Sequence, residues 1–405
     1  VVTLGARLGA GLPSLLLEDV ASLPEPAGGR VVAARRGDEP AVVVWTAGTT
    51  GAPRGVTLSA ANIAYVVAAM VHGQRLCRDD RVLSVLPAHH MFELSCGLLA
   101  ALAAGASGVF AGTLMPHEIL RLIRERRITR MAAVPLLLKL LKNDLEARRS
   151  GPGQGRLGRH LQALYSGGAP LDPAVVDYFA ALGVPVYQGY GLTETAPTVA
   201  MNTPAHNRVG SVGRALPGTE IRIDGPAGAA QGEVLVRSPA VMLGYCNDGA
   251  LTRATVDGHG WLHTGDLGRL DADGFLWLTG RAKNLIVLDS GKKVQPEEVE
   301  AALAASPLFA EACVLGLRAA DGPRAGAEQV CAVVVPADAA AGGHPGWAAL
   351  EQAVADEVAR LTRGLGGHKR PTVVKVVAGP LPKTAKGTVR HAEVARLAQQ
   401  RERVG

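Results

Sequence analysis

Short apolar runs alternate with helical patterns between about residues 41 and 190, and this alternation restricts the fold more than any other feature. Strands are predicted at four aliphatic runs: 82–86, 130–134, 161–165 and 184–187. The segments 116–126 and 173–182 each carry a proline where a helix would begin. Strands that alternate with helices predict a parallel sheet covered by helices, which is an α/β fold.

The pattern of predicted strands, turns and helices changes twice further along the chain. Between about 208 and 280, short strands such as "TEIRI" and "GEVLVRS" alternate with Gly, Asp and Pro turns, which predicts a small β subdomain. After residue 283 we expect a hairpin, a helix at 296–305, two strands, a helix near 347–363, another strand and a last helix. We therefore predict a large N-terminal domain over 1–282 and a small α+β domain over 283–405.

Composition excludes several classes of protein. The five cysteines, Cys77, Cys96, Cys246, Cys313 and Cys331, are far apart and form no CxxC pair. This spacing argues against a disulfide framework or a zinc site and favours a reducing cytoplasm. The net charge of +6 is spread along the chain with few aromatic residues among the basic ones, so we expect no nucleic-acid partner. No signal peptide is recognised, and we expect a buried helix and a strand over 94–112 rather than a membrane span.

The stretch "WTAGTTGAPRGV" at 45–56 follows the apolar run 41–44, which we expect to be a buried strand. Glycines let the backbone approach a ligand closely, and backbone N–H groups with hydroxyls supply donors for an anion. The residues that could supply these groups or a positive charge are Thr46, Gly48, Thr49, Thr50, Gly51 and Arg54. The stretch lacks the GK[ST] ending of a nucleotide triphosphatase loop. A polar turn between a strand and a helix is the alternative interpretation.

Three later stretches favour a nucleotide ligand. "YSGGAPL" at 165–171 ends a predicted strand in small residues, where a flat ring could lie against the backbone. "QGYGLTET" at 188–195 places a hydroxyl, Thr193, next to a carboxylate, Glu194, which suits a phosphate and Mg²⁺. "WLHTGDLG" at 261–268 places Asp266 in a predicted turn, where one carboxylate can accept both hydroxyls of a ribose.

With these four stretches and three more, nearly the whole chain from 41 to 391 resembles a known family. The further stretches are "LPAHHMFEL", "GRAKNLIVLDSGKKVQPEEVE" and "LPKTAKGTVR". The chain resembles the adenylate-forming superfamily of acyl-CoA synthetases, luciferases and peptide-synthetase adenylation domains, and it is most similar to long- or medium-chain fatty acid–CoA ligases. The resemblance implies ATP, Mg²⁺ and CoA as ligands, and a small C-terminal domain that is mobile.

The resemblance also implies roles for individual nucleotide-binding residues. The β- and γ-phosphates of ATP would be held by Thr46, Gly48, Thr49, Thr50, Gly51 and Arg54. The adenine would lie between Gly168, Ala169 and Pro170 on one side and Gln188, Gly189 and Tyr190 on the other. Thr193 would contact the α-phosphate, and Glu194 would bind Mg²⁺. Asp266 and Arg281 would hold the ribose, with a surface ion pair as the alternative for Arg281. The family more often has Lys at position 54 and Ser at position 47, where this chain has Arg54 and Ala47.

Further implied roles concern the acid, the pivot and the thiol. His90 matches the family's histidine at the mouth of the acyl pocket, and a core histidine is the alternative. Lys283 lies where the family pivots its C-terminal domain, and a pivot suits two half-reactions that need different groups in one site. Gly291 would line the tunnel for pantetheine, where a residue without a side chain leaves room.

The largest departure from the family pattern concerns the catalytic lysine. The family's lysine follows a glycine, whereas here Thr388 follows Gly387. Lys386 lies two residues earlier and is our candidate for the catalytic role. Lys383 is the second candidate, and a damaged first half-reaction is the third interpretation.

The resemblance implies that a carboxylate attacks the α-phosphorus of ATP to give an acyl-adenylate and pyrophosphate, and that CoA then takes the acyl group. A fatty acyl-AMP ligase or adenylation module that loads a carrier protein is one alternative. A catalytically impaired nucleotide- or acyl-binding relic is another. Family members carry about 130 further residues before the phosphate loop, so we expect the N-terminal domain to be truncated at its start. We expect no transmembrane segment, and a fatty substrate would be compatible with peripheral contact with a membrane.

Overall fold

A computed structural model describes residues 37–46, 53–147, 157–226, 231–319, 326–337, 346–383 and 389–400. By their internal contacts, Val1–Glu39 and Pro40–Gly405 form separate units, and nearly all described residues belong to the second. Five of the predicted site residues lie outside the described residues: Gly48, Thr49, Thr50, Gly51 and Lys386.

A seven-stranded sheet has the strand order β4-β3-β5-β6-β7-β8-β9. Its strands are β3 (Arg81–Ser84), β4 (Ser107–Phe110), β5 (Arg130–Ala133), β6 (Ala163–Ser166), β7 (Val186–Tyr190), β8 (Ala200–Met201) and β9 (Arg214–Ala215). The first five strands are parallel, and β8 and β9 extend the sheet in antiparallel fashion. The predicted α/β architecture is therefore confirmed.

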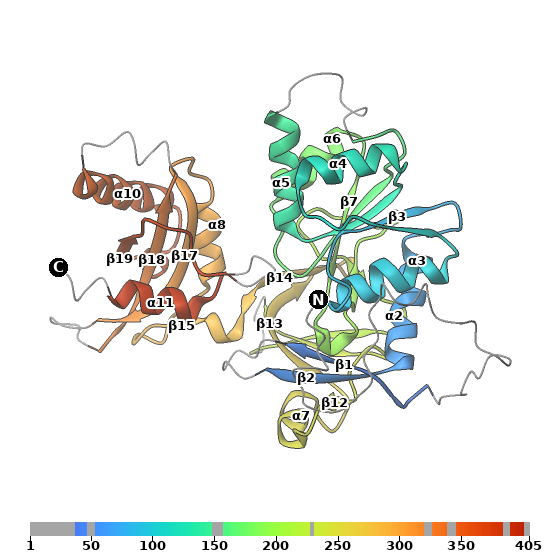
Figure 1. The fold of residues 1–405 in the computed structure, drawn as a ribbon. Helices are drawn as coiled ribbons and strands as arrows, with labels where there is room; N and C mark the ends of the chain where they lie inside the picture. The colour runs from blue at the N-terminus through green and yellow to red at the C-terminus, as the bar shows by residue number, and fades with distance from the viewer. Residues whose placement is uncertain are drawn as a thin grey trace, which may run out of the picture. The chain divides into compact units, whose positions relative to one another are not determined.

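Three helices pack with this sheet in one hydrophobic core, α4 (Pro116–Glu125), α5 (Pro135–Ala147) and α6 (Pro173–Ala181), and Figure 1 shows them grouped beside β7. Each begins with a proline, whose fixed φ suits the first helical position and whose missing N–H is not needed there. At α6 the preceding Asp172 also accepts a hydrogen bond from the N–H of Ala174 at 2.9 Å, which satisfies one free donor of the first turn.

The predicted strand at 41–44 is present, but its predicted burial is wrong, and so is the alternative of a turn between a strand and a helix. Strand β1 (Pro40–Thr46) pairs antiparallel with β2 (Arg54–Ser59), so 47–52 connects two strands rather than a strand and a helix. One face of β1 is open to solvent, with Val43 43% and Trp45 54% exposed. The sequence shows the aliphatic run, but burial of both faces depends on neighbours that the run does not determine.

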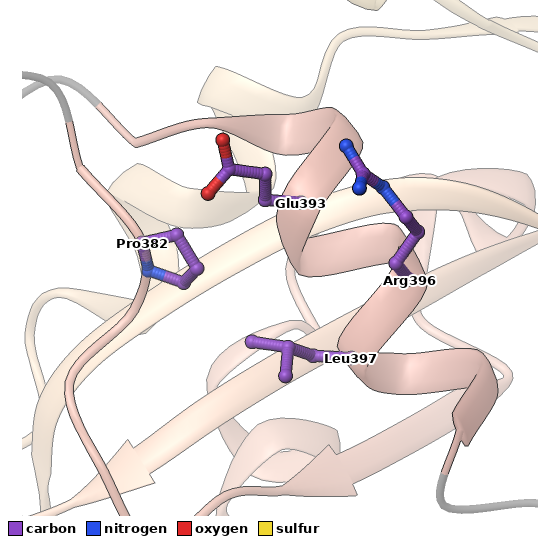
Figure 2. Close-up of a pocket in the computed structure, with 4 residues that line it drawn as sticks. All are labelled: Pro382, Glu393, Arg396 and Leu397. Atoms are coloured by element: carbon purple, nitrogen blue, oxygen red, sulfur yellow. The ribbon is translucent and has the colours of Figure 1, made fainter.

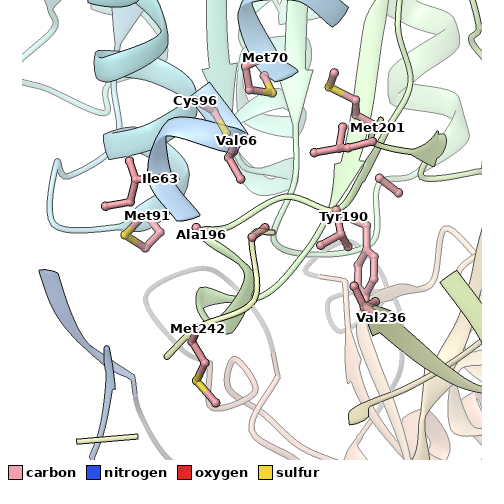
Figure 3. Close-up of a cluster of buried hydrophobic side chains, with 14 of the residues drawn as sticks. Ile63, Val66, Met70, Met91, Cys96, Tyr190, Ala196, Met201, Val236 and Met242 are labelled. Atoms are coloured by element: carbon pink, nitrogen blue, oxygen red, sulfur yellow. The ribbon is translucent and has the colours of Figure 1, made fainter. Parts of the chain in front are cut away.

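A second hydrophobic core joins these strands to the rest of the N-terminal part. Helix α2 (Ala60–Gly73) follows β2 directly and is capped by Ser59, which accepts from the N–H of Asn62 at 3.1 Å. Figure 3 shows Ile63, Val66 and Met70 of this helix beside Met91 and Cys96. The predicted helix and strand over 94–112 correspond to a π-helical segment Phe92–Leu99, helix α3 (Ala100–Ala103) and β4. Among the described residues, no helix is both long and apolar enough to cross a bilayer.

A four-stranded antiparallel sheet occupies most of the predicted β subdomain. Its strands are β10 (Glu220–Asp224), β11 (Gly232–Arg237), β13 (Leu262–Leu270) and β14 (Leu276–Arg281). Two short strands in the same range pair elsewhere: β9 joins the seven-stranded sheet, and β12 (Gly244–Tyr245) joins β2. Helix α7 (Gly249–Thr255) follows β12.

The residues after 283 form α+β structure of their own. Strands β15 (Ile286–Val287) and β16 (Lys293–Val294) make the predicted hairpin. Strands β17 (Phe309–Arg318), β18 (Glu328–Pro336) and β19 (Val373–Val376) make a sheet. Helices α8 (Pro296–Leu303) and α10 (Trp347–Leu361) pack on one face of this sheet, and α11 (His391–Gln400) packs on the other. Alternate residues of β17 enter the two cores, as the two-residue period of a strand requires.

Candidate active site

The two predicted adenine-binding segments lie at the same edge of the sheet: 168–170 follows β6, and 188–190 forms the end of the neighbouring parallel strand β7. Ser166 at the end of β6 pairs with Gln188 in β7, so the turn at 167–170 lies beside 188–190. The backbone at Gly167 comes close to the carbonyl oxygen of Gly189, because a Cβ on Gly167 would lie 3.4 Å from it. Ligands of open α/β sheets bind in the crevice at the carboxyl ends of the strands. The structure therefore brings together the segments that contain Ala169 and Gln188.

The carboxylate of Asp266 is held between two side chains. The Nε of Arg281 lies 2.8 Å from Oδ1, and the hydroxyl of Tyr190 donates to Oδ2 at 2.8 Å. The predicted turn at Asp266 is wrong, because the residue lies within β13, directly opposite Arg281 in β14. Each carboxylate oxygen keeps a second acceptor position for a ligand hydroxyl. The ion pair does not exclude the predicted ribose contact.

Burial has the largest effect on the pKa values of Asp266 and Tyr190. Asp266 is only 5% exposed, and its burial raises the pKa of its carboxyl above the usual value, although Arg281 and the hydrogen bond from Tyr190 oppose this. Burial and the neighbouring Asp266 raise the pKa of the Tyr190 phenol well above its usual value, so the hydroxyl stays a hydrogen-bond donor. Tyr190 was predicted beside the adenine; the structure adds that it orients Asp266.

Glu194 lies in a short helical turn, Thr193–Thr195, that follows β7. Its Oε1 accepts a hydrogen bond from the hydroxyl of Tyr245 at 2.8 Å, and its backbone carbonyl accepts from the N–H of Met242 at 2.8 Å. Burial and the adjacent Glu194 raise the pKa of Tyr245. Its hydroxyl therefore stays protonated and acts as the donor of this hydrogen bond. One hydrogen bond leaves a carboxylate with further acceptor positions, and carboxylate oxygens are ligands that Mg²⁺ prefers. Glu194 thus fits the predicted metal role.

Sequence reasoning missed Tyr245. It lies in β12, opposite Val56 of β2, so it connects the Glu194 turn to the strand that leaves the predicted phosphate loop. Thr46 and Arg54 flank this loop and are paired in the β1–β2 register. The sequence offers no local signal for Tyr245, because its partner lies 51 residues away along the chain.

The turn that carries Thr193 and Glu194 depends on close backbone contact. A Cβ on Gly191 would lie 1.9 Å from the backbone oxygen of Pro197, and no side-chain rotation can relieve that overlap. We expect Gly191→Ala to lower the free energy of unfolding by about 3 kcal/mol, measured by urea denaturation. Gly258→Ala is the control, because a Cβ there has open space within 4 Å. Equal effects of the two substitutions would contradict the prediction.

His90 lies just before the π-helical segment. Its backbone carbonyl accepts from the N–H of Leu94 at 2.9 Å, and its ring centroid is 4.3 Å from that of His89. Glu93, three residues later, is fully buried and accepts from the N–H of Leu86 at 3.2 Å. Burial raises the pKa of this carboxyl. Glu93 therefore fixes the segment that carries His90, a role that the sequence motif did not reveal.

Comparison with known proteins agrees with this geometry. A model of the AMP-binding enzyme family matches residues 10–246, and a model of the AMP-binding enzyme C-terminal domain matches residues 298–388. The chain belongs to the AMP-binding enzyme family. The predicted resemblance to adenylate-forming enzymes is thereby confirmed.

Individual members of the family are similar over much of the chain. The indoleacetate–CoA ligase of Aromatoleum aromaticum is 33% identical over 367 residues, which are 88% of this chain and 67% of that protein. The long-chain-fatty-acid–CoA ligase FadD15 of Mycobacterium bovis is 32% identical over 332 residues, 70% of this chain and 54% of that protein. The chain thus spans between about half and two thirds of these relatives. The crystal structure of ATP-bound MatB from Rhodopseudomonas palustris has a TM-score of 0.76 at 29% identity, covering 91% of this chain and 70% of that one.

Of the predicted functional residues in the C-terminal part, the structure describes Lys383 and Gly291 but not Lys386. Lys383 forms an ion pair with Glu311 at 2.7 Å and a strand-like bridge with Val389. Lys386 lies between Lys383 and Val389 in the sequence, outside the described residues. Gly291 lies in the β15–β16 turn with φ of 75°, and its N–H donates to the carbonyl of Leu288 at 2.8 Å. The turn itself therefore requires glycine. The catalytic role of Lys386 and the tunnel role of Gly291 stay predictions.

At the predicted pivot, burial and the nearby Arg281 guanidinium lower the pKa of Lys283. A shallow pocket elsewhere in this AMP-binding enzyme is lined by Pro382, Glu393, Arg396 and Leu397 (Figure 2). None of its lining residues is a predicted site residue, and we assign it no ligand.

Proposed function

We propose that this chain uses ATP to convert a carboxylic acid into an acyl-adenylate and then transfers the acyl group to CoA. The observation that carries the proposal is the carboxylate of Asp266, held by the hydroxyl of Tyr190 and the guanidinium of Arg281. One buried carboxylate for a ribose and one hydrogen-bonded carboxylate for a metal, joined through the end of β7, form a nucleotide site.

Different residues would bind different parts of ATP in the first step. Asp266 and Arg281 would hold the ribose, and the turn at 168–170 and the end of β7 at 188–190 would enclose the adenine. The loop that contains Gly48, Thr49, Thr50 and Gly51, with Thr46 and Arg54 at its ends, would hold the β- and γ-phosphates and then the leaving pyrophosphate. Mg²⁺ held by Glu194 would supply charge neutralisation. The chain itself contributes positioning and electrostatic stabilisation, which are the main sources of catalysis in phosphoryl chemistry.

In the second step, a thiol attacks the acyl carbon, and AMP leaves. CoA is the proposed thiol, because the relatives reported above are named as CoA ligases. A carrier-protein phosphopantetheine is the alternative acceptor. Rotation about Lys283 would withdraw Lys386 and bring the turn at Gly291 to the site.

The proposed acid has an apolar body. The stretch His90-Met91-Phe92-Glu93 resembles long-chain acyl synthetases, which favours a fatty acid, as does the likeness to FadD15. The likeness to the indoleacetate–CoA ligase favours an aromatic acid as the second candidate.

Pyrophosphate release tests the proposal. The assay uses ATP, Mg²⁺ and a panel of acids from acetate to palmitate with indoleacetate and coumarate, each with and without CoA. We expect release with a subset of apolar acids and stimulation by CoA. Release that is indifferent to CoA would favour the carrier-protein alternative. Nucleotide binding without release for any acid would favour the binding relic.

A further inference from the structure

Three side chains with metal-binding chemistry meet in the C-terminal part, outside the nucleotide site. They are Glu300 of α8, Cys313 of β17 and His391, the first residue of α11. One ligand atom from each, a carboxylate oxygen, Sγ and a ring nitrogen, lies within 4.8 Å of the other two. Among the described residues, this is the one group of at least three such side chains.

The contacts within the cluster are specific. Sγ of Cys313 lies 3.9 Å from Nδ1 of His391, and Oε1 of Glu300 accepts from the N–H of Val314 at 2.7 Å. Cys313 is fully buried, and the other two side chains are partly buried. Main-chain anchoring fixes one oxygen of Glu300 and leaves the carboxylate able to bind a cation with the other.

The same groups do not form a nucleophilic site. Burial and, to a lesser extent, the charge of Glu300 raise the pKa of the Cys313 thiol above its usual range. Reactive cysteines have lowered pKa values in electropositive, partly exposed surroundings. A covalent role for Cys313 is therefore disfavoured, whereas a metal ion can displace a thiol proton directly.

We propose that Glu300, Cys313 and His391 bind one zinc ion, with a water molecule as the fourth ligand. Zn²⁺ combines Cys, His and carboxylate ligands in tetrahedral sites, with bonds of about 2.0–2.3 Å. Ligand atoms in such a site are about 3.5 Å apart, whereas these atoms lie within 4.8 Å of one another and Cys313 Sγ lies 3.9 Å from His391 Nδ1, so zinc binding would draw the side chains closer. Mg²⁺ and Ca²⁺ require oxygen ligands and do not suit a thiolate and an imidazole.

The cysteine spacing argued against a zinc site because such sites usually draw on CxxC pairs. Here the three ligands come from three elements, and only the packing of α8 and α11 against β17 assembles them. A bound ion would link all three elements. Because it binds the folded chain, it would also stabilise it against unfolding.

Cobalt binding to the full chain tests the proposal without ATP, acid or CoA, so its outcome is independent of the proposed catalytic activity. The chelator-treated protein is titrated with Co²⁺ in excess Mg²⁺, and the thiolate-to-cobalt absorption band is followed, with Zn²⁺ as competitor. The variants are Cys313→Ser and His391→Gln. The matched controls are Cys77→Ser and His160→Gln, which replace an exposed cysteine and an exposed histidine elsewhere.

We expect the native chain and both controls to bind one equivalent with a thiolate band that Zn²⁺ abolishes. Cys313→Ser should lose the band. His391→Gln should weaken binding at least about tenfold, because even substitutions beyond the direct ligands cost that much. Zinc should also raise the melting temperature of the native chain and of Cys77→Ser, but not that of His391→Gln.

Two results would overturn the proposal. One is a native chain that shows neither the thiolate band nor a zinc-dependent rise in melting temperature. The other is an unchanged band in Cys313→Ser or unchanged affinity in His391→Gln, which would place the metal on exposed side chains. If Cys313→Ser does not fold, the affinity of His391→Gln for cobalt tests the proposal instead. Circular dichroism first establishes that His391→Gln is folded, as expected for a partly exposed position.

Discussion

Replacing Lys386 with alanine is expected to lower the rate of acyl-adenylate formation by about 100- to 1,000-fold. An ammonium group next to the attacking carboxylate and the α-phosphate stabilises charge in a closed site far better than water does. The second half-reaction, measured with a preformed acyl-adenylate and CoA, should change less than about threefold, since the lysine would have left the site by then. Single-turnover measurements of each half-reaction separate the two effects.

Lys383→Ala is the matched control for this experiment. Its ammonium is already paired with Glu311 at 2.7 Å, and both side chains are partly exposed. Loss of such a pair costs about 0–1 kcal/mol, so stability should change slightly and the adenylation rate should stay near that of the native chain. A rate that collapses in Lys383→Ala and not in Lys386→Ala would reverse the assignment. Equal adenylation rates in the native chain and both variants would show that neither lysine contributes to the first step.

Asp266→Asn is expected to weaken ATP binding by about 10- to 100-fold, because hydrogen bonds to a charged acceptor are worth about 1.5–3 kcal/mol. Isothermal titration with ATP and with a ribose-lacking adenine control measures the loss. The loss should be large for ATP and small for adenine. Equal losses for both ligands would indicate that the substitution disturbs the whole site rather than the ribose contact.

The same substitution should change how thermal stability depends on pH. Burial raises the pKa of Asp266 in the folded chain, so its carboxyl favours folding while protonated. That contribution is lost as pH rises through the folded-state pKa. The asparagine side chain of the variant cannot ionise, so the melting temperature of Asp266→Asn relative to the native chain should increase from acidic to neutral pH.

Asp271→Asn, in the same β13–β14 hairpin, should change the melting temperature with pH in the opposite direction. The hydrogen bond from the indole of Trp277, with further donors, lowers the pKa of Asp271 to about 2. Its stabilising contribution is present above the unfolded-state pKa and is lost as pH falls toward 2. The Asp271→Asn variant should therefore melt below the native chain at neutral pH and approach it in acid. Parallel pH profiles for the two substitutions would refute the burial argument for Asp266.

Local sequence patterns predicted the parallel sheet and its helices well, and the reason is physical. Proline at the first position of α4 and α6 and the aliphatic runs of β3 and β5 act within a few residues. The exposed face of β1 and the strand position of Asp266 were not predicted, because both depend on which strands become neighbours. Tyr245 was missed for the same reason, since its partner Glu194 lies 51 residues away along the chain. Glu93 was missed although its partner Leu86 is only seven residues away, because the motif does not show that the carboxylate turns inward to a backbone N–H.

Arg281 is the last residue of β14, and the predicted pivot at Lys283 follows two positions later. A sugar bound to Asp266 and Arg281 would therefore restrict the backbone immediately before the pivot. If the two orientations of the following domain differ in their fit to the nucleotide, each orientation has its own nucleotide affinity. By thermodynamic reciprocity, the nucleotide then biases the orientation to the same extent that the orientation alters nucleotide binding.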